Sequence, residues 1–355
     1  MTKFAFIVHP IAARDAARKY PILGLLPDSA IEAIMRPMKP KFVSHITGIR
    51  SKTGAETEGW FIGLPMTPHM LTDEHRIEAA YDQITRCAVM AKELGADIIG
   101  LGAFSSVVGD GGITIAKRSP IAVTTGNSYT VATAIEGAMK ACALLDVNLA
   151  SSTLAVVGAT GSIGKTCARV LAPKVAQTVL VGRDASKTQE FAGELKSARA
   201  STDPADLREA DVVITVSSAG REIVFPEHLK PGAVVVDVAR PRDVSVRVAN
   251  ERPDVLVIEG GVVKVPGDVN FNFNFGFPPK TAYACMSETM MLALEGRPES
   301  FTLGKDVSVE QVEETWRLAE KHGFELAGFR SFEREVGQDA IDRARRARNS
   351  QPVMV

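Results

Sequence analysis

The stretch TLAVVGATGSIG, residues 153–164, decides the fold of this chain. Its apolar first half predicts a buried β-strand, and its glycines, spaced GxxGxxG, predict a tight turn that leads into a helical run. Glycine suits such a turn because it has no Cβ, so a pyrophosphate can approach the backbone closely and the following helix start favours phosphate. An ordinary strand–helix turn is the alternative. We expect a dinucleotide site made by Gly158, Thr160, Gly161, Ser162, Ile163 and Gly164.

Further runs rich in Val and Ile follow this turn and alternate with helix-like segments. Runs of this kind, without polar alternation, are typical of parallel strands covered by helices on both faces. We therefore predict a doubly wound Rossmann sheet of about five strands. Ser217, at the end of one of these runs, is included among the expected cofactor-binding residues. The runs after the first are residues 178–183, 211–218, 233–239 and 255–261.

The N-terminal part predicts a second α/β unit, and the C-terminal part predicts mostly helices, one of them from about Thr281 to Glu295. The final charged segment is expected to form a frayed surface helix. The predicted domains are an N-terminal α/β substrate domain (1–150), an NADP-binding Rossmann domain (151–265) and a C-terminal segment (266–355). The N-terminal strands are expected at 4–8, 42–46, 60–64, 97–104 and 121–125, with helices at 74–94 and 128–145.

Arg183 follows the second predicted strand of the Rossmann domain, where a residue that reads the cofactor ribose should lie. An acidic residue there suits the 2′-hydroxyl of NAD, whereas Arg suits a 2′-phosphate. Arg183, with Lys187 one turn further on, favours NADP(H), although Asp184 could take the acidic role. The alternative is that these are solvated surface charges.

Composition excludes several classes of protein. The 355 residues are enough for two to three domains, and 41 basic against 42 acidic residues give no surplus for binding nucleic acid. The sequence has no apolar run long enough to span a membrane, and the apolar run at 4–8 is too short for a signal peptide. Four cysteines without metal-ligand spacing give poor support for a zinc site or a disulfide framework, so we expect a cytoplasmic protein without a metal.

Cys285 differs from the other cysteines by its position. Cys87, Cys142 and Cys167 lie within predicted helices and are expected to be small core residues. Cys285 follows two prolines and begins a helix, where the helix start should stabilise a thiolate and lower its pKa. From its chemistry alone, a structural role for Cys285 is still favoured.

From about Leu94 to Phe324 the chain resembles the cyanobacterial long-chain acyl-[acyl-carrier-protein] reductases, which make fatty aldehydes with NADPH. The match is loose in the N-terminal third, where His9 is in register with a family histidine. The blocks that carry the resemblance are LGAFSSVV (101–108), TTGNSYT (124–130), LAVVGATGSIG (154–164), EGGVV (259–263), ACMSETMMLALEG (284–296) and KHGF (321–324).

The resemblance implies a mechanism for this chain. It places the acyl-accepting cysteine at Cys285, which would attack an acyl thioester of a carrier protein or of CoA and pass the acyl group on for reduction to an aldehyde. An aldehyde-consuming partner enzyme is a further expectation. The segment 124–130 would supply hydrogen-bond donors to the acyl oxygen, with Thr125 and Asn127 as candidates. His9 is a candidate proton donor, although a lone histidine is more often structural.

The sequence departs from this family before Cys285 and in its Arg-rich tail. Phenylalanines alternate with Asn and Gly, which puts them on one face of an extended segment, either a half-buried strand or a wall of an acyl pocket. An acidic carrier protein needs basic residues to dock, and Arg36, Lys39 and Lys41 are the first candidates. The alternating residues are Phe271, Phe273, Phe275 and Phe277, and the second basic cluster is Arg343, Arg345, Arg346 and Arg348.

Two other functions remain open at this stage. One is an oxidoreductase like shikimate dehydrogenase, which needs no cysteine but usually relies on a Lys/Asp pair that is not evident here. The other is a non-catalytic protein that senses NADP(H).

Overall fold

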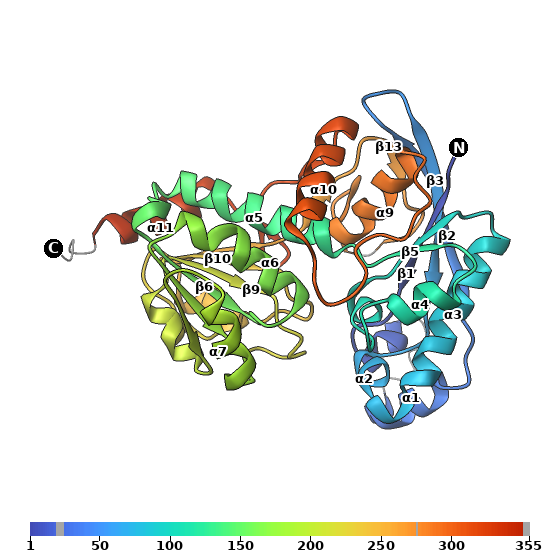
Figure 1. The fold of residues 1–355 in the computed structure, drawn as a ribbon, viewed down its shortest axis with the longest axis horizontal. Helices are drawn as coiled ribbons and strands as arrows, with labels where there is room; N and C mark the ends of the chain where they lie inside the picture. Colours follow the sequence, from blue (N-terminus) through green and yellow to red (C-terminus); the bar gives the residue numbers. More distant parts are fainter. Residues whose placement is uncertain (19–24, 275, 351–355) are drawn as a thin grey trace. The chain divides into compact units, whose positions relative to one another are not determined.

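The computed structural model describes residues 1–18, 25–274 and 276–350 (Figure 1). These form two compact units, of which the first contains residues 1–129, 263–305 and 314–325, and the second 130–262, 306–313 and 326–355. Each unit is built around its own largely parallel sheet, which confirms the predicted α/β class with a Rossmann sheet. The three-domain division at 150 and 265 stays a prediction, since a compact unit need not fold by itself.

The sheet of the second unit has the strand order β11-β10-β9-β6-β7-β8, and all its neighbouring strands are parallel. The order reverses between β6 and β9, and open α/β sheets bind ligands outside the carboxyl ends of the strands at such a point. β8 was not predicted because its sequence, ARAS, has no Val or Ile and lies partly exposed at the sheet edge. The strands are β6 (Thr153–Val157), β7 (Gln177–Val181), β8 (Ala198–Ser201), β9 (Val212–Thr215), β10 (Val234–Asp237) and β11 (Leu256–Glu259).

Helices cover this sheet, and the last of them is anchored rather than frayed. Helix α11 (Gln338–Asn349) buries Ile341 and Ala344, and Arg348 forms an ion pair with Asp211 at 3.1 Å, which corrects the expectation of fraying as far as Asn349. Residues 351–355 of the expected segment lie outside the described residues. The other helices of this unit are α6 (Ser162–Leu171), η6 (Ala172–Lys174), α7 (Ala185–Gly193), η7 (Pro204–Glu209), η8 (Pro226–His228), α8 (Val246–Glu251) and η5 (Leu149–Ser151).

The sheet of the first unit has the order β13-β2-β3-β1-β4-β5. β3, β1, β4 and β5 are parallel, whereas β2 and β13 are antiparallel to their neighbours. The expected strand at 97–104 is shorter, because a 3-10 helix begins at Ala103. The strands are β1 (Phe4–Val8), β2 (Lys41–Arg50), β3 (Glu56–Gly63), β4 (Ile98–Gly100), β5 (Ala122–Thr124) and β13 (Gly267–Asn270).

Alternate residues of β1 point to opposite faces of this sheet, and each face has its own helix. Ala5 and Ile7 pack in one core with Ile84 of α3 (Ile77–Glu93). On the other face, the ring of Phe6 and the Thr289 side chain of α9 (Ala284–Leu294) both lie close to Gly100. The remaining helices are η1 (Ala13–Arg18), α1 (Asp28–Met35), α2 (Pro68–Thr72), η3 (Glu74–Arg76), η4 (Ala103–Ser106) and α4 (Ile113–Arg118).

Helix α9 begins three residues later than predicted, because Thr281–Tyr283 form the short strand β14. It ends at Leu294. Gly296, two residues further on, has a positive φ of 67°, and the N–H groups of Gly296 and Arg297 donate to carbonyls of the last turn, as is common at helix ends. The residues of α5 (Asn127–Leu144) and α10 (Val309–His322) are divided between the two units. The remaining short strands are β12 (Val262–Lys264), β15 (Glu325–Leu326), β16 (Arg330–Ser331) and β17 (Arg334–Glu335).

Within the described ranges, none of the helices combines the length and apolar character that crossing a membrane requires.

Candidate active site

The carboxyl ends of neighbouring parallel strands bring the candidate catalytic residues of the first unit together. His9 follows β1, Ala103 follows β4 and Thr125 follows β5, and these strands are adjacent in the order β1-β4-β5. Cys285 comes from the distant helix α9, which packs on the same sheet.

Cys285 is the second residue of α9 and is half-buried, whereas the other three cysteines are buried. Burial raises the pKa of the Cys285 thiol to about 12, although the backbone N–H groups of Met286, Cys285 and Ala103 act in the opposite direction. The expected lowering of this pKa by the helix start is therefore wrong for this conformation, because burial outweighs the backbone donors. Burial also raises the pKa of Cys142 and of Cys167 to about 12.

The turn between β5 and α5 lies directly against Cys285. Gly126 has a φ of +76°, and a Cβ at this position would lie 2.3 Å from the Cα of Cys285. Glycine is therefore required both for the left-handed backbone and for the close approach. The predicted residues Thr125 and Asn127 flank this glycine, so the structure brings them near the cysteine.

The Thr125 hydroxyl is already engaged, because it donates to the carbonyl oxygen of Thr302 at 2.5 Å. A hydroxyl has one proton to donate, so this contact argues against Thr125 as a side-chain donor to an acyl oxygen. Asn127 is buried and begins α5.

His9 holds the loop that follows β4. Its Nε2 accepts the backbone N–H of Phe104 at 3.1 Å, and its Nδ1 is 3.0 Å from the carbonyl oxygen of Pro10. These partners assign the neutral tautomer with the proton on Nδ1, and burial lowers the pKa of this histidine. Both ring nitrogens thus contact the backbone, and His9 supports the loop that carries the N–H of Ala103.

Glu288 and Ala103 were not identified from the sequence. Glu288 is fully buried one turn after Cys285, and its carboxylate accepts hydrogen bonds from the segment 124–129 and from Thr302. Both residues lie inside blocks that carry the family resemblance, which is the signal that could have drawn attention to them.

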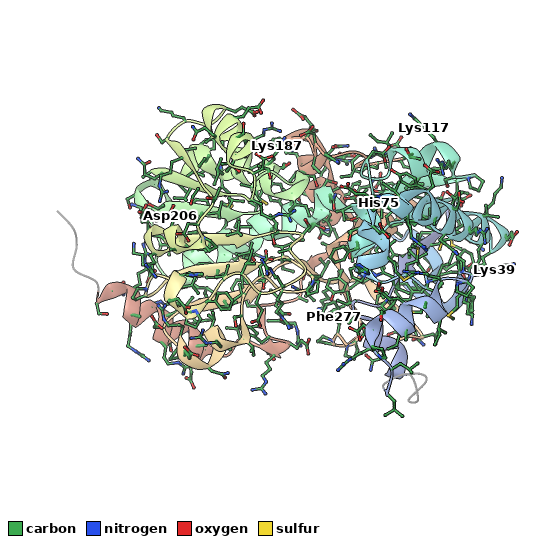
Figure 2. The ribbon with its side chains drawn as sticks, turned by 90° about the horizontal axis from the view of Figure 1, so that it is seen from below. Lys39, His75, Lys117, Lys187, Asp206 and Phe277 are labelled. Carbon is green, nitrogen blue, oxygen red and sulfur yellow. The ribbon has the colours of Figure 1, made fainter. Side chains whose placement is uncertain are left out.

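The alternating phenylalanines are in part on one face. Phe271 and Phe273 both contact the ring of Phe61. The ring centroid of Phe61 lies 6.0 Å from that of Phe271 and 5.9 Å from that of Phe273. Phe277, labelled in Figure 2, packs against Tyr283 at 4.4 Å, directly before α9. Phe275 lies outside the described residues. These contacts are compatible with both alternatives, a half-buried segment and a pocket wall.

The glycine turn in the second unit fits a dinucleotide. Gly158 has a φ of +81°, and a Cβ there would lie 2.8 Å from the Cα of Ser217. A Cβ on Gly164 would lie 2.3 Å from the carbonyl oxygen of Gly158. Helix α6 begins after Gly161 without a side-chain cap, so its start can receive a phosphate group.

Asp184 is used for capping a helix rather than left open to a ribose. Its carboxylate accepts the backbone N–H of Lys187 at 3.1 Å and pairs with the Lys187 ammonium at 3.3 Å. Arg183 is exposed and, among the described residues, has no ion-pair partner. Of these two neighbours, Arg183 is therefore the one whose charge is open to a ligand. Lys187 lies at the surface (Figure 2).

Ser217 is held beside the glycine turn by Asp243. The Ser217 hydroxyl donates to Asp243 at 2.6 Å, and its backbone N–H donates to the other carboxylate oxygen at 2.9 Å. Burial raises the pKa of Asp243 to about 6, with a contribution from the nearby Asp237 carboxylate.

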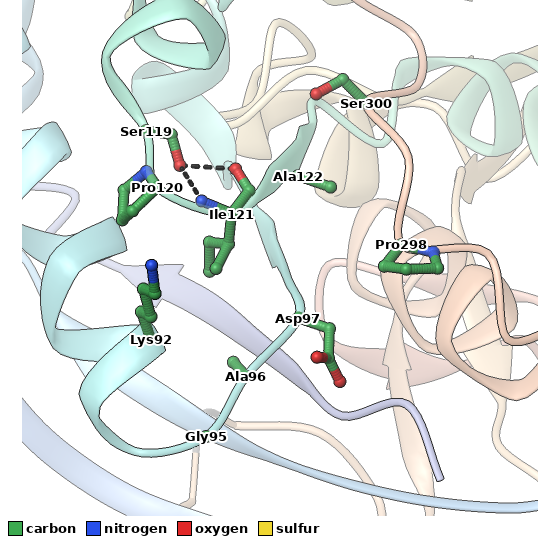
Figure 3. A pocket seen from close by; sticks show the side chains of 10 residues that line it. All are labelled: Lys92, Gly95, Ala96, Asp97, Ser119, Pro120, Ile121, Ala122, Pro298 and Ser300. Atoms are coloured by element: carbon green, nitrogen blue, oxygen red, sulfur yellow. Dashed lines mark hydrogen bonds between the residues drawn. The ribbon is translucent and has the colours of Figure 1, made fainter.

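An open depression in the first unit lies at the ends of the strands that are opposite to those carrying the candidate catalytic residues (Figure 3). Asp97 precedes β4, and Ile121 precedes β5, so this depression is at the amino ends of the strands, whereas ligands of α/β sheets bind at the carboxyl ends. None of the candidate residues lines it. Within the described ranges no cluster of three or more metal-ligating side chains is found.

The second unit is a Rossmann domain of the dinucleotide-binding class, as its strand order and glycine turn define it. Residues 140–259 match the family model described as shikimate / quinate 5-dehydrogenase, and the cofactor of this domain is NADP(H).

Two curated relatives match most of the chain. The aminotransferase PigE of Serratia sp. (strain ATCC 39006) is 30% identical over 96% of this chain, which spans only 41% of that protein's length. The long-chain acyl-[acyl-carrier-protein] reductase of Synechococcus elongatus is 28% identical over 81% of this chain and 87% of its own. A solved structure, L-tryptophan dehydrogenase from Nostoc punctiforme, aligns with 98% of this chain and 90% of its own at 14% identity and a TM-score of 0.41. The sequence matches support an NADP(H)-dependent oxidoreductase.

Proposed function

We propose that this chain reduces an acyl thioester to an aldehyde with NADPH, through an acyl group carried on Cys285. The observation that carries the proposal is the half-buried Cys285 at the start of α9, packed against the turn at Gly126. The backbone of Met286 and of Ala103 opposes the rise in the thiol pKa that burial causes. The similarity to the Synechococcus reductase supports the same substrate class and a carrier protein as donor.

The proposed reaction has two stages, acyl transfer to Cys285 and reduction of the acyl group. Cys285 loses its proton and its sulfur bonds to the acyl carbon, while the thioester bond breaks and the donor thiol leaves with a proton. NADPH, when bound by Gly158, Gly161, Gly164 and Arg183, supplies a hydride. Uptake of that hydride and a proton releases the aldehyde and regenerates the Cys285 thiol. The developing negative charge needs hydrogen-bond donors, and the backbone N–H groups near Cys285 are better candidates than the engaged Thr125 hydroxyl.

The test is the mass of the intact protein after incubation with a long-chain acyl-CoA or acyl-carrier protein, without NADPH. The wild-type chain should gain one acyl group, and peptide mapping should place it on Cys285. Cys285→Ser should bind NADPH normally but form neither adduct nor aldehyde, because a serine hydroxyl is a much weaker nucleophile at neutral pH.

Cys87→Ala is the matched control, since Cys87 is fully buried in α3 of the same unit and should be dispensable for the adduct. Full aldehyde formation by Cys285→Ser would contradict the covalent mechanism. The rate of adduct formation should rise with pH between 7 and 9, because burial keeps the thiol protonated.

A second candidate is a non-covalent oxidoreductase of the shikimate dehydrogenase type, which the match over residues 140–259 favours. That match lies in the nucleotide domain, so it bears on the cofactor more than on the substrate. Turnover of NADP(H) with a hydroxy acid, without any adduct on Cys285, would favour this candidate. Binding of NADPH without turnover of either substrate class would favour an NADP(H) sensor.

An aldehyde product implies an enzyme that consumes it. The name of the Serratia relative, an aminotransferase, is compatible with this, because aminotransferases act on carbonyl groups.

A further inference from the structure

Glu288 is a buried carboxylate for which the proposed chemistry has no use. It is fully buried in α9, one turn after Cys285, and within the described residues it forms no ion pair with a cation. A buried carboxylate is costly unless hydrogen bonds replace its water, and an apolar side chain of similar size would often be more stable. Its presence therefore indicates a role other than packing.

Four donors converge on this carboxylate. The hydroxyls of Thr124 and Thr302 donate to Oε1 at 2.5 and 3.0 Å. The Ser128 hydroxyl and the Tyr129 backbone N–H donate to Oε2 at 2.6 and 3.0 Å. Because Ser128 and Tyr129 belong to the first turn of α5, the charge also lies at the positive end of a helix dipole.

A short relay connects Glu288 with the turn that contacts Cys285. The backbone N–H of Gly126 lies 3.4 Å from the Thr124 hydroxyl, the same hydroxyl that donates to Glu288. Gly126 in turn leaves no room for a side chain between itself and the Cα of Cys285. The carboxylate thus fixes both sides of this contact, since it belongs to α9 and binds the segment 124–129.

We propose that Glu288 is a positioning residue for Cys285, which holds the turn at Gly126 against the first turn of α9 so that the attacking sulfur stays aligned with the acyl carbon. This inference rests on the proposed function. It assigns to Glu288 no contact with substrate or cofactor.

The first test is the steady-state kinetics of Glu288→Gln. The amide oxygen can still accept the Tyr129 N–H, so the fold is retained. The amide nitrogen cannot accept the hydroxyl protons of Thr124 and Thr302, so the hydrogen bonds that hold the turn are weakened. We expect kcat for aldehyde formation to fall by about 10- to 100-fold with KM changed less than about threefold, because alignment rather than binding is lost. A kcat within about twofold of wild type would overturn the proposal.

Thr124 provides an independent test that leaves the carboxylate in place. Thr124→Val removes the hydroxyl of the relay in a strand where Val is well tolerated, and it should lower kcat in the same way, whereas Thr124→Ser should restore it. Ser287→Ala is the matched control. The buried Ser287 hydroxyl of α9 donates to the carbonyl oxygen of Tyr283, the residue before this helix, and its loss is expected to be neutral. Equal losses in Thr124→Val and Thr124→Ser would contradict the relay.

Alkylation of Cys285 by iodoacetamide, followed by mass, separates this proposal from the proposed function. The Glu288 charge raises the pKa of Cys285, so Glu288→Gln should alkylate faster at a fixed pH near 8 although its acyl reduction is slower. If the wild-type chain forms no acyl adduct, the proposed function fails. The alkylation rates still show whether the Glu288 charge acts on the Cys285 thiol. An unchanged pH profile of alkylation in Glu288→Gln, or faster alkylation at the buried cysteines as well, would overturn the role of Glu288.

Discussion

At the scale of single residues, the chain uses adjacent charged side chains for different purposes. Asp184 caps α7 and pairs with Lys187, while Arg183 before it has no ion-pair partner among the described residues. A cation at the end of the second strand suits a 2′-phosphate, because Arg can form two parallel hydrogen bonds with it.

We predict that Arg183→Ala weakens NADPH binding by about 1–3 kcal/mol while NADH binding changes little. Titration of each cofactor by its fluorescence measures both affinities. Lys187→Ala is the control and should have the smaller effect, since that ammonium is shared with Asp184. An unchanged preference for NADPH over NADH in Arg183→Ala would show that another residue reads the phosphate.

Asp243 makes the stability of the chain depend on pH. Its folded-state pKa, raised by burial to about 6, exceeds the usual value near 3.8, so the unfolded chain releases this proton first as pH rises. The stability that it contributes is complete below about pH 4 and is lost as pH rises through about 6. Asp243→Asn stays neutral and can still bind Ser217, so its stability relative to wild type should be higher at pH 8 than at pH 5. The expected difference in unfolding free energy is on the order of 1–1.5 kcal/mol, and the melting temperatures measure it. If calorimetry gives the same difference in melting temperature between the two proteins at pH 5 and at pH 8, this prediction is contradicted.

At the scale of elements, the contact between the β5–α5 turn and the start of α9 leaves no room for a side chain. Gly126→Ala places a Cβ 2.3 Å from the Cα of Cys285 at a positive φ, so the turn must shift. We expect this variant to lose acylation of Cys285 by at least about 100-fold and to be less stable by about 1 kcal/mol or more.

Gly193→Ala is the matched control for this substitution. Gly193 lies in α7 with nothing within 4 Å of an added Cβ, so alanine there should be neutral or slightly stabilising. Wild-type rates of adduct formation in Gly126→Ala would show that the turn adapts without moving the thiol.

The elements also show how far sequence reasoning extends. β6, β9, β10 and β11 were predictable, because each is a short apolar run that is buried on both faces. β8 was not, because an edge strand needs no such run. Glu288 could be assigned a place in a helix but not a role, since its partners Thr124 and Ser128 lie 164 and 160 residues away in the chain. The same holds for the pKa of Cys285, which the helix start alone would lower and tertiary burial raises.

At the scale of the molecule, the two basic clusters differ in how open they are to a partner. Arg345 donates to the Leu144 carbonyl and Arg348 pairs with Asp211, so half of the tail cluster is used for anchoring α11. Arg36, Lys39 and Lys41 are all exposed, and no ion pair joins them to other described residues (Lys39 is labelled in Figure 2). Phe42 next to them is 52% exposed, which adds an apolar contact to the charge.

We predict that charge reversal at Arg36, Lys39 and Lys41 raises KM for an acyl-carrier protein about tenfold and leaves acyl-CoA nearly unaffected. Added salt should have the same effect on the wild-type chain, because exposed charges are screened beyond about 8–10 Å. Reversal of Arg343 and Arg346 in the tail is the control. Equal losses with both donors would mean that the segment supports the fold rather than docking.

The order in which the chain contributes segments to the two units determines which sheet is completed first during synthesis. The first unit is interrupted after Tyr129 and resumes at Val263, so the ribosome completes the whole sheet from β6 to β11 before it makes α9. Domains fold as units while the chain emerges. On the proposed mechanism, a nascent or truncated chain that stops before residue 284 possesses the sheet that binds the reductant but lacks Cys285, the thiol that accepts the acyl group. Incomplete chains therefore cannot sequester acyl groups that they are unable to release.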